Sequence, residues 1–308
     1  MANFALKVIR LGFSLSGSLF PHTTAKLAFT LFCRTPSRRP KGEKAAAMEA
    51  EGRRKLAEAQ KIPFVSGSST VMAYRFNGDG RPGRPRCLVV HGWGSNAAYI
   101  AALPTGLAAN GAEIVVLDWP GHGLSSGRSL NMRQAVEAAI EAERRFGRFD
   151  AVVGHSFGGA CLMLAIGGVF KAAGSISPDK AVVIGAPSHI HWLFDDFAAM
   201  VGLSSRVKQL LIRHTEKIAG APLDDFDTVA VATRRDIPLL VVHAEDDKEV
   251  AANHARRFDG SAAARLHWAN GLGHRRIVSD GGVIDTIAAF LAEASKPSSR
   301  LSDGDAAA

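Results

Sequence analysis

The sequence lacks the residue patterns of several common protein classes. Its three cysteines, at positions 33, 87 and 161, are odd in number and scattered, so no disulfide framework is expected and a reducing compartment, the cytoplasm, is favoured. None of its eleven histidines stands in an H-E-x-x-H or zinc-type Cys/His spacing, and we therefore expect no metal. His189 and His191 lie two residues apart near Asp195, a grouping that we interpret as a polar cluster.

The positive charge is concentrated near the N-terminus. The formal net charge is +8, and residues 1–60 hold eleven Lys or Arg against four Glu, which accounts for +7 and leaves +1 for the rest. These basic residues lie on no recognisable nucleic-acid-binding fold and lack interleaved aromatic residues, so nucleic acid is not an expected partner.

Residues 1–33 are apolar and contain no acidic residue. Two apolar stretches flank Pro21, and neither reaches the roughly 18 uninterrupted apolar residues of a membrane-spanning helix. Three interpretations stay open: a signal peptide, a helix on an anionic membrane surface, and a helix packed on the domain. Arg10 interrupts the early apolar stretch and no A-x-A site follows, which argues against the first. We favour a helical extension over residues 1–60 that contacts a membrane peripherally through residues 1–33.

The body of the chain, residues 61–295, alternates strand and helix patterns as βαβ units require. Its apolar strand runs have no polar face, which is typical of a parallel sheet covered on both sides. We predict an α/β fold with a mostly parallel, doubly wound sheet, followed by a disordered tail at 296–308. The predicted strands are 87–91, 113–118, 150–154, 181–185, 238–243 and 264–269, and the predicted helices are 97–110, 131–146, 157–170, 249–258 and 281–294.

About 50 residues separate the strand ending at Gly185 from the strand beginning at Pro238, far more than a simple crossover needs. This segment is rich in helix formers and predicts a small helical cap over residues 187–236, with helices at 192–201, 205–219 and 225–232. Its apolar side chains either line a substrate pocket or pack the cap onto the core. The pocket candidates are Trp192, Phe194 and Phe197, with Leu193, Met200 and Leu203 beside them.

The most informative motif is the G-x-S-x-G run that ends in Phe157-Gly158, between a short apolar strand and a helical stretch. Strand and helix pass close together at such a turn, so a Cβ at Gly154 or Gly158 would clash. Ser156 is then held in a strained backbone conformation with its hydroxyl presented at the sheet edge. This context favours a nucleophile over a glycine-rich turn that happens to contain serine.

A serine hydroxyl needs an imidazole to accept its proton and a carboxylate to orient that imidazole. Asp247 follows one late strand and His274 follows the next, which places both at the same end of a parallel sheet as Ser156. The chain order Ser156, Asp247, His274 is the order expected on such a scaffold.

These ordered motifs, over residues 70–295, resemble the α/β-hydrolase fold family of serine hydrolases, esterases and lysophospholipases. The resemblance implies that Ser156 is the nucleophile, His274 the general base and Asp247 the acid. It also implies an oxyanion hole made by the backbone amides of Trp93, in a His-Gly-x-Gly turn, and Phe157.

Two departures from the family pattern concern the acid. Asp247 stands four residues after His243, as in the family's H-G-x-x-D motif, but Ala244 replaces the glycine. The neighbouring Asp246 also offers a second carboxylate, and we favour Asp247.

Three other histidines stand near these motifs. We expect His91 to make structural hydrogen bonds and His122 to shape the floor of the site. We expect the side chain of His155 to point away from Ser156.

The leading interpretation is a serine hydrolase that cleaves an ester or thioester of an apolar, lipid-like acyl group through an acyl-enzyme, with no cofactor. Acyl transfer, C–C hydrolysis and perhydrolysis use the same catalytic groups and stay open. A non-catalytic binding module is the third interpretation, and the intact Ser, Asp and His positions argue against it. The sequence does not indicate the oligomeric state.

Overall fold

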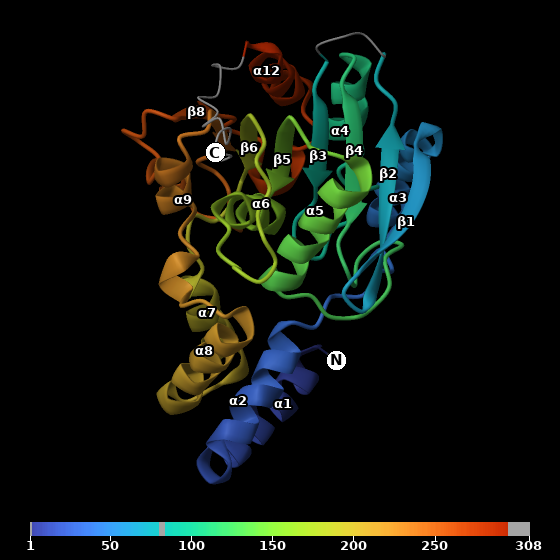
Figure 1. Ribbon diagram of the computed structural model, residues 1–308. Helices are drawn as coiled ribbons and strands as arrows, with labels where there is room; N and C mark the ends of the chain where they lie inside the picture. Colours follow the sequence, from blue (N-terminus) through green and yellow to red (C-terminus); the bar gives the residue numbers. More distant parts are fainter. Residues whose placement is uncertain (1, 80–83, 295–308) are drawn as a thin grey trace, which may run out of the picture.

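An eight-stranded sheet forms the centre of the computed structural model, which describes residues 2–79 and 84–294 (Figure 1). The strand order is β1-β2-β4-β3-β5-β6-β7-β8, and among these strands β2 pairs antiparallel with both of its neighbours while the others pair in parallel. The strands are β1 (Gln60–Ser66), β2 (Ser69–Phe76), β3 (Arg86–Val90), β4 (Glu113–Asp118), β5 (Ala151–His155), β6 (Lys180–Ile184), β7 (Leu239–His243) and β8 (Ala264–Trp268).

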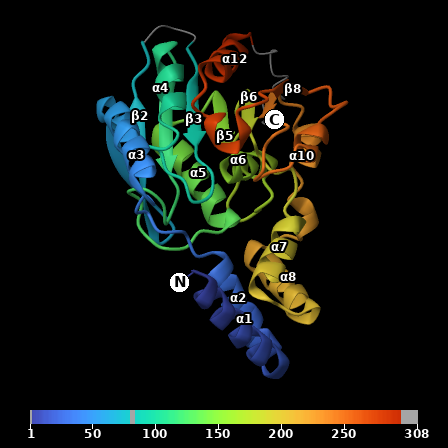
Figure 2. The same cartoon turned by 180° about the vertical axis from the view of Figure 1, so that it is seen from behind.

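Helices cover both faces of the sheet, which confirms the predicted α/β doubly wound architecture (Figures 1 and 2). One apolar core lies between the sheet and α5 and α6, and the other lies between the sheet and α4 and α12. Because β5, β6 and β7 are buried along their whole length, their apolar residues show no alternation. The helices of the body are α3 (Glu43–Lys55), α4 (Ala102–Ala109), α5 (Met132–Phe146), α6 (Phe157–Gly167), α10 (Asn253–Arg256), α11 (Gly273–Arg276) and α12 (Gly281–Ala292).

Several predicted boundaries are wrong for identifiable reasons. The β1–β2 hairpin begins at Gln60 and was not predicted, although its pairing is local and closes with Ser66 opposite Ser69 across a two-residue turn at Gly67. The helix expected at 97–110 begins only at Ala102, because the Asp118 carboxylate holds the Ala97 amide in the preceding turn. The helix expected at 157–170 ends at Gly167, where Gly168 is left-handed with φ 62°.

Two further helices are shorter in the structure than the sequence predicted. The helix expected at 249–258 is reduced to the single turn α10, because the Asp247 carboxylate accepts hydrogen bonds from the Glu249 and Val250 amides and holds that segment as a loop. In the cap, the helix expected at 225–232 begins at Thr228, where the Asp227 side chain caps it.

The cap expected between β6 and β7 is present and consists of three helices. They are α7 (His191–Val201), α8 (Ser205–Ala219) and α9 (Thr228–Arg235). The helical N-terminal extension is also present, as an antiparallel pair formed by α1 (Ala2–Leu19) and α2 (Pro21–Phe32). This pair projects beyond the sheet beside α8, so the cap and the extension form one helical layer over the end of the strands (Figures 1 and 2).

The extension is fastened to the cap by packing and by hydrogen bonds. Ala25 and Ala28 of α2 are fully buried in the helical layer, where α2 packs on α8. The Arg10 guanidinium donates to the Met200 carbonyl oxygen over 2.9 Å, at the C-terminal end of α7, where a cation is favoured. None of the helices in the described ranges is both long and apolar enough to cross a membrane. The expected tail at 296–308 lies outside the described residues.

Candidate active site

The strand-turn-helix motif predicted at Ser156 is present between β5 and α6. Ser156 has φ 53° and ψ −125°, a backbone conformation that costs a non-glycine residue about 1–3 kcal/mol. Its amide donates to the Ile184 carbonyl oxygen over 2.8 Å, which anchors the turn to β6. A Cβ at Gly154 would lie 2.5 Å from the Gly159 Cα, and one at Gly158 would lie 2.5 Å from the His91 carbonyl oxygen. The turn therefore requires glycine at both positions.

Ser156, His274 and Asp247 form a continuous line of hydrogen bonds. The Ser156 hydroxyl lies 3.0 Å from His274 Nε2, and His274 Nδ1 lies 2.7 Å from Asp247 Oδ2. The turn after β5, the loop after β7 and the short helix α11 after β8 supply the three side chains, which meet at the carboxyl end of the parallel strands. This geometry lets the imidazole accept the serine proton at Nε2 while Nδ1–H donates to the carboxylate.

The Asp247 carboxylate is buried but well supplied with donors. Burial by itself would raise its pKa, but hydrogen bonds from His274 and from the Val250 and Glu249 amides outweigh burial and lower the pKa below its ordinary value. Asp247 is therefore ionised at neutral pH. The neighbouring Asp246 accepts the Gly271 amide and makes no contact with His274, so the structure brings Asp247 and not Asp246 to the imidazole.

Trp93 and Phe157, the residues expected to supply the oxyanion hole, lie next to each other and line the cavity with Ser156. Their rings are 5.5 Å apart in an edge-to-face arrangement, and a Cβ at Gly92 would lie 2.9 Å from the Ser156 Cβ. Both backbone N–H groups have no acceptor within the described protein.

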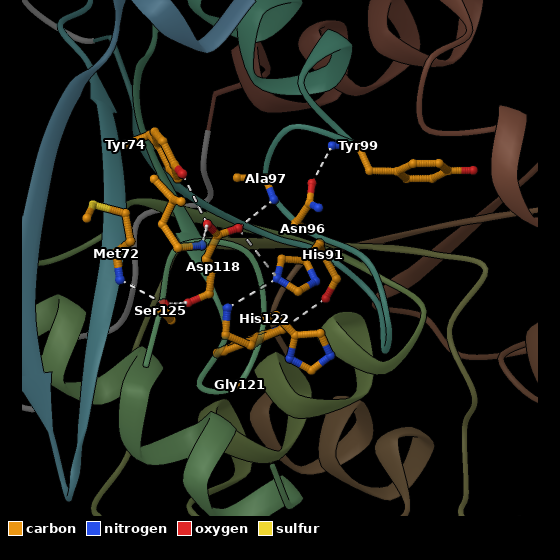
Figure 3. A network of polar contacts seen from close by, with 12 residues as sticks. Met72, Tyr74, His91, Asn96, Ala97, Tyr99, Asp118, Gly121, His122 and Ser125 are labelled. Carbon is orange, nitrogen blue, oxygen red and sulfur yellow. Dashed lines mark hydrogen bonds and ion pairs between the residues drawn. The ribbon is translucent and has the colours of Figure 1, made fainter. Parts of the chain in front are cut away.

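A buried polar network holds the turn that carries Trp93 (Figure 3). The Gly94 amide donates to His122 Nε2 over 3.0 Å, and the Ala97 amide donates to Asp118 Oδ1 over 2.7 Å. His91 Nε2 accepts from the Trp119 amide over 3.1 Å. His91 and His122 therefore have structural contacts of the kind expected from the sequence.

His155 contacts His274. Its ring lies 4.8 Å from the His274 ring, and its Nε2 is 2.9 Å from the His274 carbonyl oxygen. His155 thus supports the loop that carries His274. The sequence predicted only that this side chain points away from Ser156, and it did not predict the contact with His274. The G-x-S-x-G motif places no requirement on the residue at position 155 and so did not predict this contact, which depends on the position of α11.

Burial keeps these supporting histidines neutral, which makes the fold sensitive to acid. Burial lowers the pKa of His91 to about 4 and those of His122 and His155 to about 3. The unfolded chain binds protons at these positions below its ordinary histidine pKa of about 6.5, and the folded chain does not. We expect the free energy of unfolding to fall from pH 6.5 towards pH 4, by about 1.4 kcal/mol per pH unit for each of the three.

Urea unfolding at a series of pH values measures this dependence. A His122→Gln variant, with the ring removed, should show a shallower slope between pH 6 and pH 4.5. An unchanged slope in that variant would contradict a neutral buried His122.

A cavity of about 710 Å³ opens above Ser156, under the helical layer. The expected cap residues Trp192, Phe194 and Phe197 line it, together with Leu193 and Met200, whereas Leu203 does not. Phe194 and Phe197 also pack the cap, since their rings lie 5.0 Å from Phe32. These two residues therefore both line the cavity and pack the cap against α2, and their role in binding a substrate stays a prediction.

The sequence did not indicate that the N-terminal extension forms a wall of this cavity. Leu6 and Ile9 of α1 and Phe29 and Phe32 of α2 line it. The apolar pattern of residues 1–33 predicted helices but not which surface they cover, because that depends on packing against the cap. Glu249 is a second residue that was missed: one of its oxygens is 4.0 Å from His274 Nε2, and the other is paired with Arg275 over 2.6 Å.

The described part of the chain offers no group of three or more His, Cys, Asp or Glu side chains arranged to hold a metal ion. His191 is instead paired with Asp224 over 3.2 Å, and the His189 ring packs on the His254 ring at 4.8 Å.

Comparison with known proteins identifies the family. A model described as "Alpha/beta hydrolase family" matches residues 87–286, which is more than half of the chain, and the protein therefore belongs to the α/β-hydrolase family. No curated protein gives a significant match.

Three solved structures illustrate the similarity of fold. The Pyrococcus furiosus esterase Pf2001 is 14% identical with a TM-score of 0.57, over 83% of this chain and 98% of that one. Est1E of Butyrivibrio proteoclasticus, solved with ferulic acid, is 16% identical with a TM-score of 0.55, over 75% of this chain and 96% of that one. A membrane phospholipase A described as a bacterial virulence factor is 17% identical with a TM-score of 0.56, over 94% of this chain and 98% of that one. At these identities the likeness shows the fold.

Proposed function

We propose that this hydrolase is a serine esterase that cleaves carboxylic esters or thioesters of apolar acyl groups through an acyl-enzyme. The observation that carries the proposal is the hydrogen-bonded line from Ser156 through His274 to Asp247, which opens into an apolar cavity of about 710 Å³. An isolated strained serine would not be aligned with both an imidazole and a buried carboxylate.

The geometry supports a two-step acyl transfer. As Ser156 Oγ attacks the carbonyl carbon, His274 Nε2 takes its proton, and Asp247 stabilises the imidazolium. The Trp93 and Phe157 amides stabilise the oxyanion, where one such donor is worth about 2.7–4 kcal/mol. His274 then protonates the leaving alcohol or thiol. Water, deprotonated by His274, attacks the acyl-enzyme, releases the acid and restores the Ser156 hydroxyl.

The cavity wall supports an apolar acyl substrate. Aromatic and aliphatic side chains from α1, α2 and α7 surround the space above Ser156, and a volume of this size is within the range of pockets that enclose a whole small molecule. The names of two structural neighbours, an esterase and a phospholipase A, are consistent with this substrate class.

Two measurements test the proposal. A fluorophosphonate probe should label the folded wild-type protein at Ser156, as shown by mass spectrometry of the labelled peptide. A series of p-nitrophenyl esters from acetate to palmitate should then give an optimum of kcat/KM at a medium or long acyl chain. Folded protein that neither reacts with the probe nor hydrolyses any ester would exclude the serine esterase.

A further inference from the structure

Helix α1 has two apolar faces, and only one of them is covered. The inner face, formed by Leu6, Ile9 and Phe13, packs against the main core. The opposite face, which we call the outer stripe, remains between 54% and 73% exposed. The outer stripe consists of Phe4, Val8, Leu11, Leu15 and Leu19.

The spacing of the outer stripe places all its residues on one side of the helix. Successive members are three or four residues apart, which is the spacing of neighbours along a helix face. A helix that is apolar on all sides is normally covered on all sides, and monomeric proteins rarely expose a large contiguous apolar patch. The stripe continues at the tip of the helical pair, where Phe20 is 64% exposed (Figure 1).

The charge of the N-terminal segment that carries the stripe favours one kind of partner over another. Residues 1–42 contain seven Lys or Arg and no Asp or Glu, and Lys7 and Lys26 of the helical pair are exposed. A second copy of the chain would bring two such cationic segments together, whereas a membrane rich in anionic lipid would attract them.

We propose that the outer stripe of α1 docks the protein on the surface of an anionic lipid membrane. The helix lies in the interface with its outer face among the lipid headgroups and upper acyl chains, as amphipathic helices with flanking cations do. The inner face stays on the protein, where Leu6 and Ile9 line the cavity. A single helix thus separates the lipid from the pocket.

Vesicle co-sedimentation tests this proposal independently of catalysis, because it is carried out in a Ser156→Ala background. The full chain is mixed with vesicles of phosphatidylcholine alone or with 30% phosphatidylglycerol added. We expect binding to the anionic vesicles, weaker binding to the neutral ones, and a loss of binding as salt is raised.

A matched pair of double variants locates the binding surface. Leu11→Gln with Leu15→Gln removes two methyl-rich side chains from the outer stripe and keeps a good helix former at both positions. Met48→Gln with Val65→Gln makes the same chemical change at two exposed apolar positions on α3 and β1. We expect at least a tenfold weaker vesicle partition for the first pair and an unchanged partition for the second.

Substitution of the exposed lysines tests the contribution of charge to vesicle binding and leaves the outer stripe unchanged. Lys7→Gln with Lys26→Gln should weaken binding to anionic vesicles by about fivefold per lysine and leave binding to neutral vesicles unchanged. Circular dichroism establishes that each variant is folded.

Three results would overturn the proposal. These are a wild-type chain that stays in the supernatant with anionic vesicles, equal partition of the two double variants, and a stripe variant that turns a dimer into a monomer in analytical ultracentrifugation while vesicle binding is unchanged. The last result would show that a second copy covers the stripe.

Discussion

Ser156→Ala should reduce the kcat for p-nitrophenyl ester hydrolysis by on the order of 10⁶-fold, to the background rate, because the hydroxyl that attacks the carbonyl is gone. Substrate binding should survive, since the cavity wall of α1, α2 and α7 is untouched. Assays with wild type and variant at equal concentration measure the loss of activity. Calorimetry with a non-hydrolysable ether analogue of the ester, applied to both proteins, measures whether the pocket still binds. A variant that retains a tenth of the activity would exclude Ser156 as nucleophile.

The backbone strain at Ser156 can be tested by stability, independently of activity, with a second inactive variant. With φ 53° and ψ −125°, the position penalises any side chain, and glycine removes that penalty. Ser156→Gly should therefore be as inactive as Ser156→Ala but more stable by about 1–3 kcal/mol in urea unfolding. Equal stability of the two inactive variants would argue against a strained turn.

Asp247→Asn should lower kcat by about 10³–10⁴-fold, because an amide neither holds the His274 Nδ1–H tautomer nor stabilises the imidazolium. KM should change little, since Asp247 does not line the cavity. The fold is expected to persist, because the asparagine carbonyl oxygen can still accept from the Glu249 and Val250 amides.

The neighbouring carboxylate is the matched control for this experiment. Asp246→Asn makes the same change one residue away, at an exposed position that accepts only the Gly271 amide in the described structure. It should reduce kcat by less than tenfold. Equal losses in the two variants would mean that the loop conformation, and not the Asp247 charge, matters to the reaction.

The candidate site was largely predictable because its geometry is encoded locally. The turn at Ser156 needs glycine on both sides, and the carboxyl ends of parallel strands gather whatever side chains follow them. Asp247 and His274 lie shortly after β7 and β8, so alternation of strands and helices predicted the end of the sheet at which they meet Ser156, and the resemblance to the family selected Asp247 over Asp246. Their catalytic roles remain a proposal that the variants above test.

The parts that were not predicted depend on contacts between distant segments. Strand β2 joins the sheet by its antiparallel register against β4, and residues 60–76 carry no signal of that partner. The ring of His155 finds its partner in a loop more than a hundred residues later. In the same way, the apolar pattern of α1 shows two faces that need cover but not that one of them covers the cavity.

Helices α1 and α2 shape the cavity but contribute none of the proposed catalytic groups. Helices α1 and α2 form one wall of the cavity, whereas the proposed catalytic groups lie between residues 93 and 274, together with the cavity-lining residues of α7. Divergence of this first segment between homologues can therefore reshape one wall of the cavity while the proposed catalytic groups are inherited unchanged. Selection for a new substrate can thus act on a stretch of the gene that encodes none of those groups.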